Sequence, residues 1–570
     1  MSSKFGGFHI TYRGFQKKLL GQLSLNLSVF GFGFIYLFWI HTWEVDPHHD
    51  GIMFTAAVGF KDGLIPHRDF FAQYGPLTPI LQGTWLKITE PTLINLKLLT
   101  SLSLGLIALL LFHQTKKRLG LVFAIVVTTG WVLTGPFGLI WSSIFLTLFV
   151  LIAMTLLDWS IENNHLPVSA LSTFISGILL GLAVFIRIHA IFIIFPILIF
   201  VILLKVKNLY LFNIRFFVNG IFTGILTIIG YLFITDALSS YVSQCILWAF
   251  LNYSGGPNWS KSLVFDYLWI PFLGFLHVVE YLILGRIFKA KNRSTIVVFI
   301  LLIQSLIYVA FLWISELPRT GQQTLLNPKI LLITLASKSH FAFMYTVVTL
   351  FVLAIAFLFL KKFNDKWFNQ NYLKSLFFYI FGFGSLFQLY PFADNYHIAF
   401  VVPILIFSML HNPQINFLRK PNLLIPGIVI MMIPALLISF VRLASIPRIE
   451  FKSQVLKGMY GSWRTAESVD HTMQALSNYA IVRNVRFDCP DGLYAAASGH
   501  YLANNEKFVT WGPNSLKNSR YVQIFACYVD QIGIDQYKNL GWIPISKTEY
   551  LPMSDSSGKQ YWNVLFEREK

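Results

Sequence analysis

The sequence predicts a mainly α-helical, polytopic membrane protein with a small α/β domain at its C-terminal end. Three observations lead to this fold class. The 570 residues are 55% hydrophobic and only 12% charged, about half the charged fraction of soluble domains. The apolar residues fall into long runs separated by short polar loops, and after about Ser445 these runs give way to polar turns. This pattern excludes a soluble globular enzyme.

The apolar runs predict where the chain crosses the membrane. A spanning helix needs about 20 predominantly apolar residues. Stretches that meet or approach this length predict thirteen spans, at 24–43, 93–112, 119–135, 139–157, 168–186, 190–204, 216–235, 263–284, 294–313, 341–360, 374–391, 397–411 and 422–442. The first stretch is too long for the apolar part of a signal peptide and no small-residue cleavage site follows it, so we expect it to remain as an anchor.

The basic residues predict the orientation of these spans. The net charge is +18, and the basic side chains gather in short clusters between apolar runs, such as HQTKKR at 113–118 and KKFNDKWFNQNYLK at 361–374. Such clusters fall in alternate loops, which the positive-inside rule places in the cytoplasm together with the N-terminus. The distribution therefore argues against nucleic acid as a partner. The loop 158–167 is the exception, because it contains acids and no Lys or Arg.

An odd number of spans divides the chain into two predicted domains. Residues 1–445 form the transmembrane domain, and residues 446–570 lie outside the cytoplasm. In the second part, polar turns such as DCPDG alternate with short apolar runs such as YVQIFACYV, which predicts an α/β domain with its own modest core. Cys489 and Cys527 lie there and could pair in an oxidising compartment, and two buried free thiols are the alternative.

The first outer loop, residues 44–92 with predicted interfacial helices, is where acids concentrate. Polar groups need partners in hydrocarbon, so this loop must leave the bilayer or line a cavity in it. The run HHDGIMFTAAVGF predicts a helix that begins near Asp50, whose carboxylate would face the cavity or only cap the helix. Together with Glu44 and His49, the side chains of Asp46, His48 and Asp50 would also suit a divalent cation such as Mg or Mn, although their spacing matches no zinc template.

The same loop contains a second polar stretch, PHRDFFAQYGPLTP. Its aromatic residues Phe70, Phe71 and Tyr74 are typical of an interfacial segment that lies at the membrane surface, with Arg68 and Asp69 facing water. The alternative is a functional one, in which Asp69 positions an acceptor or Arg68.

Polar residues at two later outer helix ends complete the set of candidates. Arg187 and His189 interrupt the apolar run GILLGLAVFIRIHAIFIIFP. A cation in such a run is costly and would suit a lipid phosphate, with snorkelling from a helix end as the alternative. In YPFADNYH, His397 could donate to a phosphate while Asp394 holds its tautomer, or Asp394 could cap the next span.

An acidic motif directly after the first span, many spans and an outer C-terminal domain together resemble the GT-C superfamily of integral membrane glycosyltransferases. The closer likeness is to bacterial members, through PHHDG, PHRDFFAQYGPLTPILQ, GLAVFIR and YPFADNYH, and it covers residues 20–440. The resemblance implies a multi-pass enzyme of the bacterial plasma membrane. Its donor would be a polyprenyl-phosphate-linked sugar, and its acceptor an extracytoplasmic glycan, lipid or protein.

The resemblance also implies roles for individual residues. The family's first-loop aspartate is the catalytic base and matches Asp50, with Asp46 as the rival. The TGPFG turn lacks the second acid that other members often carry, which leaves Asp69, Asp46 or neither as the helper. Hexosyl or pentosyl transfer with inversion is expected. The side chains expected to bind the substrates are His49, Arg68, Arg187, His189, Asp394 and His397.

Two other functions would leave different patterns. A transporter or flippase of lipid-linked sugars would show paired halves, broken helices and charges at mid-membrane. A polysaccharide polymerase or ligase would place its large loops later in the chain. The acids here follow the first span directly, and the other charges fall at the ends of spans.

Overall fold

The computed structural model describes residues 12–43, 45–135, 138–163, 166–207, 209, 211–247, 347–348, 351, 354–355, 370–389, 395–412, 435–436, 439–440, 448–479, 485–488, 492–497, 523–549 and 560–568. The predicted spans 263–284 and 294–313 lie outside these residues, as do most of 341–360 and 422–442. Glu44, Asp394 and Cys489 also lie outside them.

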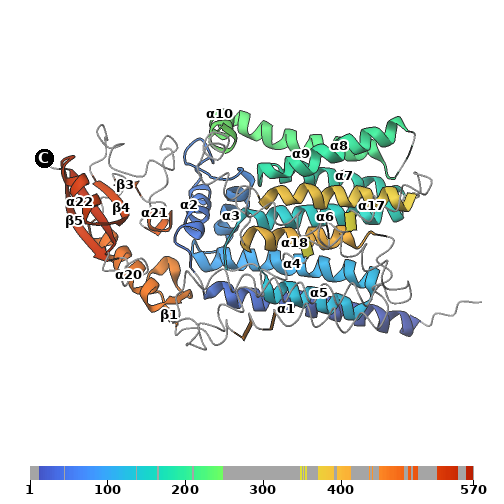
Figure 1. The fold of residues 1–570 in the computed structure, drawn as a ribbon, viewed down its shortest axis with the longest axis horizontal. Coiled ribbons are helices and arrows are strands. Elements are labelled where there is room, and N and C mark those ends of the chain that lie inside the picture. The colour runs from blue at the N-terminus through green and yellow to red at the C-terminus, as the bar shows by residue number, and fades with distance from the viewer. Residues whose placement is uncertain are drawn as a thin grey trace, which may run out of the picture.

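Long helices run side by side and form most of the molecule (Figure 1). They are α1 (Tyr12–Thr42), α4 (Leu93–Leu119), α5 (Leu121–Thr134), α6 (Ser142–Glu162), α7 (Pro167–Ala183), α8 (Ile191–Val206), α9 (Ile214–Ile234), α17 (Gln370–Ser385) and α18 (Asn395–Met409). Five helical segments in the described residues are long and apolar enough to cross a membrane, namely Gly21–Thr42, Leu93–Leu119, Ser142–Glu162, Ile188–Val206 and Ile214–Ile234.

Each of these helices coincides with a predicted span, so the chain is a mainly helical, multi-pass membrane protein. The count of thirteen spans stays a prediction. Several boundaries differ clearly from those expected. Helix α1 begins at Tyr12, ahead of its apolar run, and α4 and α6 continue to Leu119 and Glu162, past their predicted ends at 112 and 157. Helix α17 ends at Ser385, where a 3-10 turn, η6 (Leu386–Leu389), follows.

Small residues allow two of the helices to pack with their backbones in contact. Gly177 and Gly181 of α7 face Gly220 and Gly224 of α9, each pair spaced by four residues. A Cβ atom added to Gly177 would lie 2.2 Å from the Phe217 carbonyl oxygen. Close approach through such motifs is how helices associate in lipid, where apolar burial gives little driving force.

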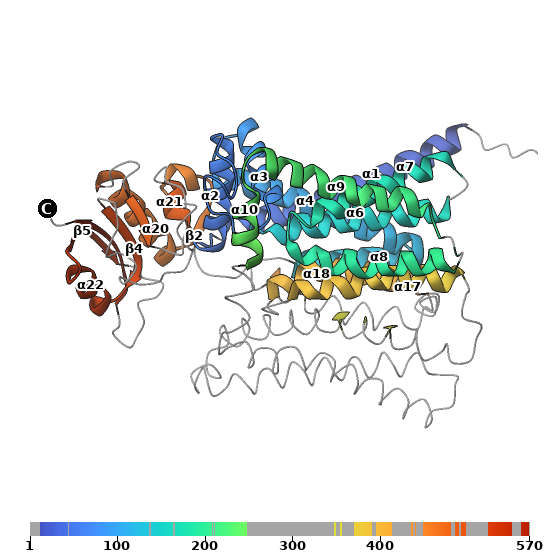
Figure 2. The ribbon, with the colours of Figure 1, turned by 90° about the horizontal axis from the view of Figure 1, so that it is seen from above.

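The first outer loop, named for the orientation that the sequence predicts, folds into two helices across one end of the bundle, α2 (His49–Lys61) and α3 (Leu77–Ile88) (Figures 1 and 2). The predicted helix near Asp50 is thus present. Gly83 brings α3 against α2, because a Cβ atom there would lie 2.6 Å from the Ala57 carbonyl oxygen. Gly75 likewise brings the start of α3 against the Phe185 carbonyl, just past the end of α7.

The prediction that Phe70 and Phe71 lie at the membrane surface is wrong. Phe70 is 1% exposed and both rings are buried inside the protein. The chain after α2 turns back, and Phe70 packs over Gly59 and Ala56 of that helix. The absence of a side chain at Gly59 leaves room for the ring, which the local aromatic pattern could not reveal.

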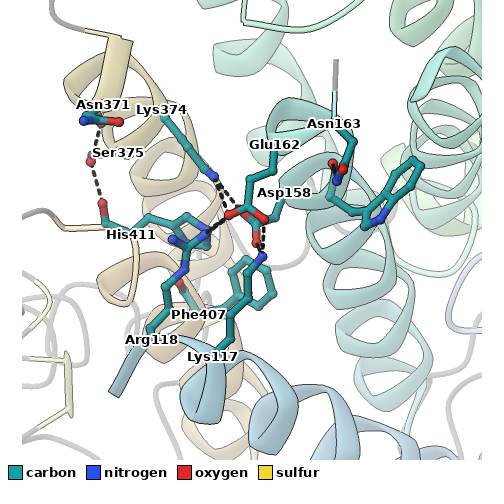
Figure 3. A network of polar contacts seen from close by, with 11 residues as sticks. Lys117, Arg118, Asp158, Glu162, Asn163, Asn371, Lys374, Ser375, Phe407 and His411 are labelled. Atoms are coloured by element: carbon teal, nitrogen blue, oxygen red, sulfur yellow. Dashed lines mark hydrogen bonds and ion pairs between the residues drawn. The ribbon is translucent and has the colours of Figure 1, made fainter. Parts of the chain in front are cut away.

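The opposite end of the bundle explains the acidic loop that departs from the basic pattern. Asp158, at the end of α6, is buried and lies 2.8 Å from Arg118 and 2.9 Å from Lys117, both of α4. Lys374 of α17 and His411, just after α18, complete this cluster at 2.6 and 2.9 Å (Figure 3). We call it the inner charge cluster, after the orientation that the sequence predicts. The acids of this loop therefore neutralise basic residues that share the same end of the bundle.

The C-terminal part is built from short strands and helices, as the polar turns predict. Two strands, β1 (Arg448–Glu450) and β2 (Tyr460–Ser462), pair antiparallel. A four-stranded sheet has the order β3-β4-β6-β5, in which only the β3–β4 pair is parallel. The remaining elements are α20 (Trp463–Tyr479), β3 (Val485–Asp488), α21 (Gly492–Ala497), β4 (Gln523–Val529), α22 (Gln531–Lys538), β5 (Trp542–Glu549) and β6 (Trp562–Arg568).

This C-terminal part shares a hydrophobic core with the first outer loop. Met53 and Phe54 of α2 are buried in the same cluster as Leu493 and Tyr494 of α21. The backbone N–H of Leu493 also donates to the carbonyl of Pro47, at 3.4 Å. Cys527 in β4 is disulfide-bonded and Cys245 is a buried free thiol.

Candidate functional site

Asp46 fixes the first turn of α2. Its Oδ1 accepts hydrogen bonds from the backbone N–H groups of His48 and His49, at 3.0 and 2.9 Å, and its Oδ2 lies 2.8 Å from His49 Nδ1. The capping role considered for Asp50 therefore belongs to Asp46. Burial alone would raise the pKa of Asp46, but the hydrogen bond and the charge of His49 outweigh it and lower the pKa. The side chain is 33% exposed, so it can reach a bound molecule.

Asp50 is enclosed one turn further along the same helix. Its Oδ2 lies 2.5 Å from Lys97 Nζ and accepts from the Asp46 N–H at 3.1 Å, and its Oδ1 accepts from the Ile140 N–H at 3.1 Å. Both charged side chains are 0% exposed. Burial raises the pKa of Asp50, and the Lys97 ammonium opposes this shift. Both carboxylate oxygens are thus engaged inside the protein.

Lys97 belongs to the candidate site and was not predicted from the sequence. It lies on α4 within the predicted span 93–112, a run without any other charge. An ionisable side chain inside a span needs a partner, which could have drawn attention to the acids of the adjoining loop. Lys97 also donates to the Gly138 carbonyl, so it joins α4 to the segment that precedes α6.

The segment Gly138–Ser143 connects the predicted site residues with one another. Its Trp141 ring lies 4.6 Å from the His49 ring and 5.9 Å from the ring of His397 on α18, measured between centroids. Tyr74, from the loop before α3, lies 5.5 Å from Trp141 on the same scale. Trp141 thus brings together residues that α2, the first loop and α18 supply.

Arg187 lies beside this aromatic group. It precedes a short 3-10 turn, η1 (Ile188–Ala190), which joins α7 to α8. Its guanidinium lies 5.0 Å from the Tyr74 ring centroid and donates to Ser143 Oγ. The side chain is only 4% exposed, so it does not snorkel to the membrane surface. His189 follows in the same turn and is half-buried.

Arg68 and Asp69 form a local ion pair elsewhere on the loop. Arg68 donates from Nε and Nη2 to the two carboxylate oxygens of Asp69, at 2.8 and 2.9 Å. Arg68 also reaches the Thr235 carbonyl at the end of α9, at 3.3 Å. The hydrogen bonds from Arg68 lower the pKa of Asp69. These contacts place the pair on a turn beside the end of α9.

His67 holds the turn that carries this pair. Its backbone has φ of 68°, and its buried ring lies with Nδ1 2.9 Å from Gln244 Oε1. The Gln244 amide donates back to the His67 carbonyl at 3.2 Å, from a π-helical turn, η2 (Val242–Leu247). Burial lowers the pKa of His67 to about 4, so the imidazole is neutral at pH 7.

The residues considered for a divalent cation do not fit one. Lys97 already provides the positive charge against Asp50, and Asp46 accepts three hydrogen bonds from His48 and His49. Across the part of the chain that the structure describes, no three His, Cys, Asp or Glu side chains converge as metal ligands.

Comparisons with known proteins find similarity to solved structures. No protein-family model matches the chain, and no curated protein matches it. Among solved structures, the oligosaccharyltransferase of Archaeoglobus fulgidus, in complex with Zn and sulfate, is similar with a TM-score of 0.42 and 12% identity. The match covers 94% of this chain and 72% of that one. A likeness of this size leaves the function to be inferred from the chain's own residues.

Proposed function

We propose that the protein is an integral membrane glycosyltransferase that moves a sugar from a polyprenyl-phosphate carrier to an extracytoplasmic acceptor. The observation that carries the proposal is that a partly exposed, oriented carboxylate and a buried guanidinium both lie beside the segment Gly138–Ser143. Asp46 supplies the first and Arg187 the second, and the segment Gly138–Ser143 links them through Trp141 and Ser143. A base and a phosphate-binding cation are the two groups that this reaction requires.

Asp46 suits the role of general base better than Asp50. A base must come within hydrogen-bonding reach of the proton that it accepts. Asp46 is open on one side, whereas both oxygens of Asp50 are held by Lys97 and by backbone N–H groups. Asp50 then has a positioning role, because its contact with the Asp46 N–H sets the first turn of α2.

The donor would bind with its phosphate near Arg187 and its lipid along the bundle. Arg187 presents a planar group that can hold two phosphate oxygens, and the ring of His397 contacts the Trp141 ring, as does the ring of His49. Helix α8 begins just after Arg187 and exposes large apolar side chains, including Phe192 and Phe195. A polyprenyl chain could lie against such a surface within the hydrocarbon of the membrane.

The proposed step is a direct displacement. The Asp46 carboxylate accepts the proton of an acceptor hydroxyl while that oxygen attacks the anomeric carbon. The bond between that carbon and the phosphate oxygen breaks, and the polyprenyl phosphate leaves with the bonding electrons. Arg187 and His397 stabilise the charge that develops on the phosphate. Attack opposite the leaving phosphate inverts the anomeric configuration.

The proposal includes the orientation of the chain. The inner charge cluster would face the cytoplasm of a bacterial cell, and α2, α3 and the C-terminal part would face outward. The contact of α21 with Pro47, next to Asp46, would bring the C-terminal part beside the incoming acceptor. The acceptor would be a glycan, a lipid or a protein.

The test is transfer by the purified protein in lipid nanodiscs. A panel of radiolabelled polyprenyl-phosphate hexoses and pentoses would be offered with membrane glycan acceptors. We expect transfer by the parent and a loss of about a hundredfold or more in kcat for Asp46→Asn, because asparagine keeps the helix cap but cannot accept the proton.

The matched control is Asp69→Asn, which removes another carboxylate of the same loop and should retain transfer. Equal activity of the parent and Asp46→Asn would exclude Asp46 as the base. Movement of an intact donor across the bilayer, without cleavage, would show that the protein is a transporter and not a glycosyltransferase.

A further inference from the structure

We infer that the seam between α3 and the segment Gly138–Ser143 reads the hydroxyl groups of the transferred sugar. Four side chains form this seam, and each presents a polar atom that has no hydrogen-bonding partner among the described residues. The inference rests on the proposed function and deepens it, since it names the part of the donor that the seam recognises. The four residues are Thr78, Gln82, Trp141 and Ser142.

Contacts along the seam place these residues together. Thr78 and Gln82 are one helical turn apart, on the same face of α3. Gln82 Nε2 donates to the Ile140 carbonyl at 3.2 Å, which brings α3 against the residues just before Trp141 and Ser142. The other end of α3 is held by the Leu77 N–H, which donates to the Phe185 carbonyl at 3.0 Å, two residues before Arg187. The seam therefore runs from the turn that contains Arg187 to Ile140, whose backbone N–H donates to Asp50.

The polar atoms of the seam are buried. Thr78, Gln82 and Ser142 are 0% exposed, and Trp141 is 7% exposed. Thr78 Oγ1, Gln82 Oε1, Trp141 Nε1 and Ser142 Oγ have no hydrogen-bonding partner among the described residues. A buried polar group without a partner costs about 1–3 kcal/mol, so four of them beside one site call for an explanation.

The chemistry of these groups matches a sugar better than an anion. Two hydroxyls donate or accept, the amide oxygen accepts and the indole N–H donates, and none of the four carries a charge. Neutral groups of mixed character pair with the hydroxyls of a sugar ring. The indole ring offers an apolar face to the C–H face of the same ring, while Arg187 remains next to it for the phosphate.

The inference predicts opposite effects on stability and on recognition. Thr78→Val and Ser142→Ala each remove a hydroxyl with little change of shape. If the hydroxyls only lack partners, their removal leaves the folded protein as stable or more stable. If they read the sugar, the same changes also weaken the enzyme's preference for a fully hydroxylated donor.

The experiment compares polyprenyl-phosphate glucose with its 2-, 3-, 4- and 6-deoxy analogues in the transfer assay. We expect the parent to discriminate against at least one analogue by about tenfold or more in kcat/KM. Thr78→Val or Ser142→Ala should reduce that discrimination by about tenfold while the midpoint of thermal unfolding is unchanged or higher. The control is Thr115→Val, which removes an equally buried, unpartnered hydroxyl near the other end of α4 and should leave discrimination intact.

The outcomes separate the two proposals. If the parent transfers sugar but both variants keep its full discrimination, the seam holds only ordered water and the inference is overturned. If the parent cleaves none of the polyprenyl-phosphate sugars, the proposed function fails first and the inference falls with it. A loss of discrimination in Thr115→Val as well would show a general loosening of the bundle and would also overturn the inference.

Discussion

The helical bundle carries a fully buried carboxylate at each of its two ends, and the two are neutralised in different ways. At the outer end, Asp50 is balanced by Lys97, which is itself 0% exposed, and by two backbone N–H groups. At the inner end, Asp158 lies within reach of Lys117, Arg118, Lys374 and His411, several of which are partly exposed to solvent.

This difference predicts which end of the bundle tolerates the substitution of a charged residue. The removal of one partner from a buried pair leaves the other charge uncompensated, and this costs far more than the pair contributes to stability. The outer pair has no substitute cation among the described neighbours of Asp50, whereas three cations surround Asp158. The outer pair also fixes Asp46 and the segment Gly138–Ser143, so damage there should reach the proposed site.

The largest effect is expected from Lys97→Met. This change leaves the Asp50 carboxylate buried without a cation and should lower the free energy of unfolding by about 3–5 kcal/mol. The double variant Asp50→Asn/Lys97→Met removes both charges and should recover most of that loss. Thermal unfolding of the purified proteins in detergent measures both. A double variant as unstable as Lys97→Met alone would show that the charge imbalance is not the cause.

At the outer end, the buried imidazole of His67 should make the stability of the protein depend on pH. The pKa of His67 is about 4 in the folded protein, below its ordinary value of 6.5, so the unfolded chain binds the proton more tightly between these values. Stability should therefore fall as the pH drops from about 6.5 to about 4, by at most about 3 kcal/mol.

Unfolding measured against pH gives this slope for the parent and for His67→Asn. Asparagine tolerates the positive φ at this position, so the fold should be kept. The variant should lose most of the slope in this window. An unchanged slope in the variant would show that other titratable groups cause the loss of stability in acid.

At the inner end, Asp158→Asn should have a smaller effect, about 2 kcal/mol. The change removes the acceptor at the centre of the cluster, but Lys117 and Arg118 keep Glu162 as a partner and can reach solvent. Thermal unfolding of Asp158→Asn, measured in parallel with Lys97→Met, compares the two ends directly. A loss equal to that of Lys97→Met would erase the distinction between the two ends.

The smallest effect is expected from Lys117→Met. This lysine is one-third exposed, and Arg118 and Lys374 remain next to Asp158 after the change. Partly exposed ion pairs contribute below about 1 kcal/mol, and less in high salt. Unfolding measured at low and high salt should show a difference between parent and variant only at low salt. A larger loss would mean that the inner cluster depends on each member.

The sequence predicts much of this architecture because apolar run length is a local property. The boundaries of α5, α7 and α9 follow directly from such runs. The polar partners are not local. Asp50 and Lys97 are 47 residues apart, and Arg118 and Asp158 are 40 residues apart. A periodic pattern shows that a span exists but not which of its side chains meets a distant loop.

The candidate site shows the same division. The sequence identifies the acids of the first loop and Arg187 as candidate site residues, because charged residues are rare beside apolar runs. The choice between Asp46 and Asp50 required their burial and their hydrogen bonds. Trp141 was hidden inside a predicted span, where an aromatic residue carries no distinguishing signal. The buried position of Phe70 depended on the empty space above Gly59.

The most direct measurement is sugar transfer by Asp46→Asn beside the double variant Asp50→Asn/Lys97→Met, both purified as folded protein. The account predicts a loss of about a hundredfold or more in kcat for Asp46→Asn, and reduced but measurable transfer by the double variant, in which the base is retained. Full activity of Asp46→Asn, together with complete loss in a stable double variant, would contradict it and return the catalytic role to Asp50.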